Sequence, residues 1–175
     1  IKRAGLVKDS DSFKRNLNLY VVSEGVDGNL ALTNSLIKQN LKTWLNKNKM
    51  VHDTVDILDG TILNLGVDYV ISADDKSNKY HVLEAVTQEL KEFFKVRPNM
   101  GESFNISDIY SVINNVRGVT DTVDVEVRLM NGASYTGVFY DIPANISSDG
   151  RFLELPEDFV WEVKFPDSDI RGSVQ

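Results

Sequence analysis

The sequence contains no cysteine, so disulfide bonds, thiolate metal ligands and cysteine nucleophiles are all excluded. Histidine is nearly absent too, with only His52 and His81 among the 175 residues. Two separated histidines exclude a histidine-rich metal site and argue against a catalytic triad. We interpret both as packing histidines, at the surface or half-buried, because that is where a lone histidine is usually found.

Long apolar runs are also missing. No stretch approaches the ~18–20 apolar residues that a membrane-spanning helix needs. Acidic side chains outnumber basic ones by 26 to 19, which gives a net charge of −7. Because a negative surface repels phosphate groups, we expect neither nucleic acid nor an anionic membrane as a partner. The apolar share of 42% is ordinary for a folded globular chain.

Acidic pairs are the main candidates for catalysis or metal binding, since no nucleotide-binding, zinc-binding or nucleophile motif occurs. The pairs are Asp74/Asp75, Asp121/Asp124 and Asp167/Asp169, with Asp9/Asp11 as a further calcium-like spacing. A catalytic carboxylate needs burial or a close charged partner, and calcium needs further oxygen ligands, neither of which the pattern supplies. The glycines at 25 and 28 flank an aspartate and are typical of a turn. The sequence therefore predicts no enzyme, no metal and no cofactor.

The alternating and helical patterns predict an α+β domain over residues 1–132. The expected elements are a hairpin of strands 1–8 and 17–23, a helix 34–48, strands within 51–60 and 61–72, helices 79–94 and 107–116, and a strand over 120–130. From residue 17 this is the β-α-β-β-α-α-β order of a ferredoxin-like split β-α-β fold. We therefore expect one four-stranded antiparallel sheet with the helices on one face, and a tight turn at Asp59-Gly60.

Apolar spacing predicts which side chains face the core. The expected positions are Ile37, Leu41 and Trp44 or Leu45 on the first long helix, Val82, Val86 and Leu90 on the second, and Leu63, Leu65, Val67, Tyr69 and Ile71 on the long strand. In the strand over 120–130, the expected inward residues are Val123, Val125, Val127 and Leu129. The residues between them are polar, so the opposite face of the sheet is expected to be at least partly in solvent.

Residues 133–175 are predicted to form a β-rich C-terminal extension. Short β segments are expected over 133–142, 151–156 and 159–165, followed by a mobile end over 166–175. Seven of the chain's 16 aromatic residues fall within 133–165, and a hairpin this small cannot bury them alone. We therefore predict interface residues here, namely Tyr140, Phe159, Trp161 and Phe165, with a core position equally open for Trp161.

Several segments together resemble a known family. They are the hairpin IKRAGLVKDS…NLNLYVVSEG, the stretch VDILDGTILNLGVDYVISAD, the helix HVLEAVTQELKEFF and above all MGESFNISDIYSVINNVRGVTDTVDVEV. Over residues 1–130 this pattern is similar to the C-terminal region of baseplate J-like proteins, which are wedge subunits of contractile phage tails. A chain that begins within a strand at Ile1 fits a piece of such a longer protein.

The resemblance implies a structural module that works by protein–protein binding in the virion, after assembly in the host cytoplasm. The implied partners are other baseplate wedge subunits and a second copy in a homodimer, and the family has no catalytic residues to carry over. The residues also leave open a small-ligand regulatory domain of ferredoxin-like fold attached to a larger enzyme. A compact pocket would favour that function, and large flat surfaces would favour assembly.

Overall fold

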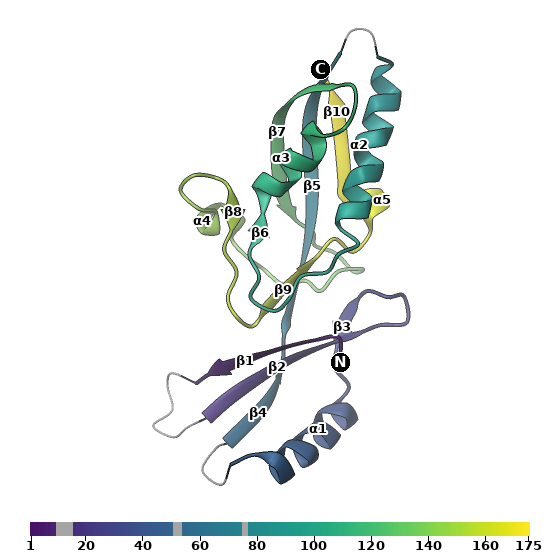
Figure 1. Cartoon of the computed structure of the whole chain (residues 1–175). Helices are drawn as coiled ribbons and strands as arrows, with labels where there is room; N and C mark the ends of the chain where they lie inside the picture. Colours follow the sequence, from purple (N-terminus) through teal and green to yellow (C-terminus); the bar gives the residue numbers. More distant parts are fainter. Residues whose placement is uncertain (10–15, 51–53, 75–76) are drawn as a thin grey trace. The chain divides into compact units, whose positions relative to one another are not determined.

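The computed structural model describes residues 1–9, 16–50, 54–74 and 77–175. The chain is α+β, and its elements fall into two compact units. The first unit contains residues 1–62, 99–102 and 156–160, and the second contains 63–98, 103–155 and 161–175. Figure 1 shows the two four-stranded sheets around which they are built. This division does not follow the expected boundary between residues 132 and 133.

The first unit is built around a central strand. Its elements are β1 (Arg3–Lys8), β2 (Asn16–Glu24), β3 (Leu30–Leu32), α1 (Ser35–Asn48) and β4 (Thr54–Asp59). Strand β2 pairs antiparallel with β1 and β3 and parallel with β4. The predicted hairpin of the first two strands is therefore confirmed. Parallel neighbours need a long crossover connection, and α1 supplies it between β2 and β4.

The second unit is built around the longest strand. Its elements are β5 (Thr61–Ala73), α2 (Lys79–Phe93), β6 (Phe104–Asn105), α3 (Ile106–Asn114), β7 (Val119–Leu129), α4 (Ile142–Asn145), β8 (Phe152–Leu153), β9 (Phe159–Glu162), α5 (Pro166–Asp169) and β10 (Ile170–Val174). The first two residues of β5 and of β9 belong to the first unit. Strand β5 pairs antiparallel with β7 and parallel with β10, and it also pairs with β9. Helices α2 and α3 pack on each other and on β10 and β7, respectively (Figure 1).

The predicted single antiparallel sheet is wrong, and a ferredoxin-like arrangement is not confirmed. Strands β4 and β5, expected side by side, belong to two different sheets, and each sheet contains a parallel pair. At the expected tight turn, Gly60 instead donates its N–H to Val21 O, and the chain continues directly into β5. Alternation along a strand shows which face is buried, but it does not show which strand lies beside it.

The C-terminal residues differ from expectation in two ways. Residues 166–175 are not a mobile end, because they form α5 and β10, and Gln175 donates its N–H to Ile71 O. Residues 133–141 contain no strand, whereas the two later predicted β segments hold β8 and β9. A parallel neighbour such as β10 lies more than a hundred residues from β5 in the sequence, so no local pattern reveals the pairing.

Burial in the second unit mostly follows the predicted periodicity. The five predicted residues of β5 and the three of α2 are buried, as are Val125 and Val127. Val123 is an error in the prediction, because it is 49% exposed while its neighbour Thr122 is buried. The pairing slips by one residue between Val70–Asp124 and Ile71–Thr122, so a β-bulge moves Val123 out of the inward register.

Candidate functional site

Helix α1 exposes much of its apolar side. Its N-cap is Asn34, whose side chain accepts a hydrogen bond from Leu36 N at 2.9 Å. No residue of α1 is buried: Leu41 and Leu45 are half-buried, while Trp44 is 61% exposed. The predicted core positions of Ile37, which is 42% exposed, and of Trp44 are therefore wrong. In this unit α1 packs mainly beside β4. A single strand covers only part of the apolar side of the helix, so the rest stays exposed.

Lysines hold α1 to its neighbouring strand. Lys38 Nζ lies 2.7 Å from Asp59 Oδ2, and Lys42 Nζ lies 3.2 Å from Asp56 Oδ1. The hydrogen bond from Lys42, followed by that from Asn16, lowers the pKa of Asp56 below its ordinary value. Helix α1 contains three lysines and no acidic residue, and Asp59 and Asp56 balance the charge of two of them.

The four aromatic residues predicted for an interface do not come together. Trp161 is buried against Phe104, with ring centroids 4.8 Å apart, so the core position holds for it. Phe159 is half-buried in the first unit, whereas Tyr140 and Phe165 belong to the second. Tyr140 donates its hydroxyl to Glu154 O at 2.7 Å, and the ring of Phe165 is 39% exposed. An interface role for these residues stays a prediction.

Phe139 is an exposed aromatic residue that the sequence reasoning missed as an interface candidate. Its side chain is 84% exposed, although hydrogen bonds hold the residues that precede it in the loop. Thr136 N donates to Asn64 Oδ1 at 2.9 Å, and Tyr135 donates its hydroxyl to Asp169 Oδ1 at 2.6 Å. This hydrogen bond to Asp169 is the main reason that the pKa of Tyr135 is raised. The density of aromatics in 133–165 was the available signal, but it did not single out Phe139.

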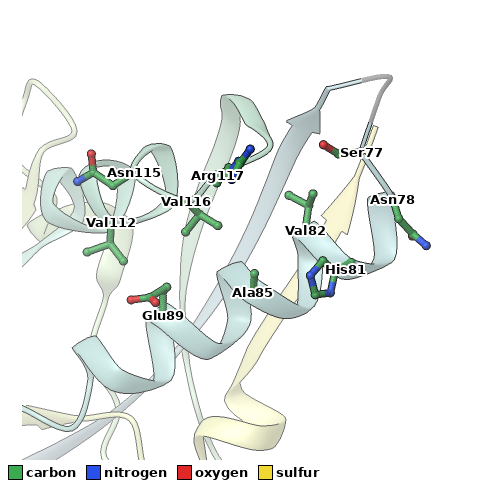
Figure 2. A pocket seen from close by; sticks show the side chains of 10 residues that line it. All are labelled: Ser77, Asn78, His81, Val82, Ala85, Glu89, Val112, Asn115, Val116 and Arg117. Carbon is green, nitrogen blue, oxygen red and sulfur yellow. The ribbon is translucent and has the colours of Figure 1, made fainter.

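A groove of about 680 Å³ lies between α2 and α3 in the second unit (Figure 2). Apolar side chains line it from both helices, namely Val82, Ala85 and Val112, and from Val116 in the turn after α3. Three exposed ionisable side chains, those of His81, Glu89 and Arg117, lie along its rim. His81 is thus a surface residue, in agreement with its interpretation as a packing or surface histidine, while His52 lies outside the described residues.

The acidic pairs do not form a common site. Asp121 and Asp124 are exposed on β7, Asp167 is exposed and pairs with Lys91 at 2.6 Å, and Asp75 and Asp11 lie outside the described residues. Asp169 is buried, but its carboxylate accepts hydrogen bonds from Tyr135, Ser168 and Phe165 N, so it closes the turn before β10. Within the described ranges, no three Asp, Glu or His side chains cluster closely enough to hold a metal ion.

Known proteins add no assignment. Neither a known protein family nor any curated protein matches the chain. None of the helices in the described part of the chain has the length and apolar character needed to cross a bilayer.

Proposed function

We propose that the chain is a structural module of a contractile-tail baseplate wedge, which acts in the virion by binding neighbouring wedge subunits rather than by catalysis. The observation that carries the proposal is the exposed apolar side of α1, formed by Leu36, Ile37 and Trp44. Fully burying one large apolar side chain gains roughly 1.5–3 kcal/mol. Tryptophan is also among the residues that most often anchor a protein interface.

Two further observations support binding to protein surfaces. Lys47 of α1, unlike Lys38 and Lys42, forms no ion pair with a described residue, and it favours an acidic neighbour because complementary charge steers and orients association. The resemblance of residues 1–130 to baseplate J-like wedge proteins supplies the biological setting. Other wedge subunits are therefore the proposed partners, with a second copy of this chain as a further one.

The experiment compares two helix variants in co-purification with contractile-tail baseplate wedge proteins. Trp44→Lys places a charge on the exposed apolar side of α1, and Asn46→Lys places the same charge at an exposed polar position of the same helix. We expect the first variant to lose co-purification at least tenfold, a loss of about 1.4 kcal/mol, and the second to behave like the parent. Equal behaviour of the two variants, or absence of the chain from purified tail particles, would contradict the proposal.

The groove between α2 and α3 favours a second function, a small-ligand regulatory domain attached to an enzyme. Its volume of about 680 Å³ lies within the ~300–1,000 Å³ typical of ligand pockets. Its apolar floor and three ionisable rim residues are the usual composition of such a site. A thermal-shift screen with amino acids and nucleotides tests this function. A stabilising ligand whose effect is lost in Arg117→Ala but kept in Arg151→Ala would favour it over assembly.

A further inference from the structure

Strand β7 is an edge of its sheet, and its outer backbone groups are not used by the sheet. Val125 donates its N–H to the hydroxyl of Tyr110 at 3.1 Å, so this group points away from β5. Met130 donates its N–H to Asn64 O on β5, so the backbone N–H and C=O groups of the even-numbered residues of β7 point toward β5. Pairing is regular from Leu129 to Asp124, and backbone direction alternates along an antiparallel strand. The N–H groups of Val127 and Leu129 therefore point outward, where no described residue accepts them.

A hollow of about 310 Å³ lies beside this edge. It is lined by Ile106 and Tyr110 from α3 and by Ile142, Pro143 and Ile146 around α4. Val127 is only 9% exposed, so little solvent reaches this part of the strand. A buried backbone group without a partner is unfavourable, and an added strand is the simplest structure that would satisfy it. A second hollow, which also borders Tyr110, extends the space toward Gly150.

Charge along β7 identifies the chemistry of the added strand. Asp124 and Glu126 are exposed and alternate with the buried Val125 and Val127. Neither carboxylate forms an ion pair with a described residue, whereas the next residue on that face, Arg128, pairs with Asp68. Opposite charges placed across two neighbouring strands stabilise their pairing. A strand added here would face the apolar hollow with one set of side chains and the two carboxylates with the other.

We infer that the free edge of β7 binds an extended segment of a partner protein, in which apolar β-branched residues alternate with lysine or arginine. The segment pairs with the outward N–H and C=O groups of Val125, Val127 and Leu129. In the unbound chain Val125 donates its N–H to the Tyr110 hydroxyl, and on binding a carbonyl group of the segment replaces that hydroxyl as the acceptor. The inference deepens the proposed assembly function and rests on it, because it names one binding mode and the kind of segment bound.

The test uses the full chain and three synthetic peptides with free-end charges blocked. The first alternates Lys and Val over seven residues, the second has Glu in place of Lys, and the third repeats the first with alternate backbone nitrogens methylated. We expect the first peptide to slow amide hydrogen exchange of Val127 and Leu129 roughly tenfold or more. The Glu peptide should leave the exchange rates of both amides unchanged, because its carboxylates are repelled by those of Asp124 and Glu126. The methylated peptide should fail because it cannot donate the strand hydrogen bonds.

Matched charge variants complete the test. Asp124→Lys/Glu126→Lys should abolish the protection, whereas Glu84→Lys/Glu89→Lys, the same change at exposed positions of α2, should keep it. Equal protection by the methylated peptide, or protection that survives the β7 variant, would overturn the inference. If no peptide protects β7 while Trp44→Lys still removes the baseplate partners, the edge inference fails and the assembly function stands. If protection occurs while Trp44→Lys has no effect, the edge inference stands and the role of α1 fails.

Discussion

Helices α1 and α2 begin alike and are stabilised differently. Both are capped by an asparagine whose side chain accepts the N–H two residues on, at 2.9 Å for Asn34 and 3.0 Å for Asn78. Helix α2 buries Val82, Val86 and Leu90, whereas α1 buries no residue. The difference lies in their surroundings, because α2 packs on both α3 and β10 while α1 packs mainly beside β4. Similar local signals thus produce a core helix in one unit and an exposed helix in the other.

The largest expected effect comes from placing a carboxylate on each helix. Val86 is fully buried, so Val86→Asp should lower the free energy of unfolding of the second unit by about 3–5 kcal/mol. Ile37 is 42% exposed, so Ile37→Asp should change the stability of the first unit by less than about 1 kcal/mol. Urea unfolding with amide exchange in both units measures each loss. Equal losses would mean that α1 is as buried as α2.

The next effect concerns ion pairs. Glu162 is 3% exposed, lies 2.8 Å from Arg97 Nη1 and accepts from Asn64 Nδ2 at 3.0 Å. Glu162→Ala leaves that guanidinium without its carboxylate and should remove about 2–3 kcal/mol from the second unit, less than for a fully buried pair because Arg97 is partly exposed. Asp56→Ala breaks the exposed pair with Lys42 and should stay within about 0.5 kcal/mol. The denaturant midpoints of the two variants measure both losses of stability. A larger loss for Asp56→Ala than for Glu162→Ala would contradict the prediction.

Alkaline pH should lower the stability of the second unit. Burial of the Tyr69 hydroxyl, which lies 2.7 Å from Thr87 Oγ1, raises its pKa above the ordinary 10.0. Because the folded value is the higher one, this stabilisation is complete below pH 10 and is lost as the pH rises through the raised value. Tyr69→Phe should remove this part of the pH dependence, whereas Tyr80→Phe, at an 84% exposed position, should not. The free energy of unfolding of both variants, measured across alkaline pH, tests this prediction.

The smallest expected effect is a loss of stability of the first unit at acidic pH. The hydrogen bonds from Lys42 and Asn16 lower the pKa of Asp56 from 3.8, so the folded unit holds this proton more weakly than the unfolded chain. Its stabilisation is present above pH 3.8 and is lost as the pH falls through the lowered value. Because the carboxylate is exposed, the change should be small and should fade in high salt. Carboxyl titration by NMR in the parent and in Lys42→Met checks it; identical titration curves would contradict it.

Local pattern predicted the parts of the fold that local contacts determine. The β1–β2 hairpin, the apolar stripe of α2 and the inward positions Val125 and Val127 were all available from the sequence. The bulge at Val123 and the parallel pairing of β10 were not, because both depend on residues far away in the chain. Trp44 illustrates the same limit, since periodicity places it on an apolar stripe but does not show how wide a surface covers that stripe.

The candidate surfaces were less predictable than the fold. Aromatic density pointed to residues 133–165, but exposure separated Phe139 from Trp161, and exposure depends on tertiary packing. The β7 edge gave no sequence signal at all. Its free N–H groups follow from the order of strands in the sheet, and that order was the part of the prediction that failed.

The interleaved path of the chain through its two units has a consequence for synthesis on the ribosome. The core of the first unit joins Val22, Leu30, Ile62 and Val160, with Met100 packed against them. Translation delivers Val22 first and Val160 last among these core residues, since synthesis proceeds from the N-terminus. Strand β2 must therefore wait, with its apolar face uncovered, until almost the whole second unit has been made. Nascent chains stalled before residue 156 would leave the first unit open to proteases, because Val160 would still be missing from its core.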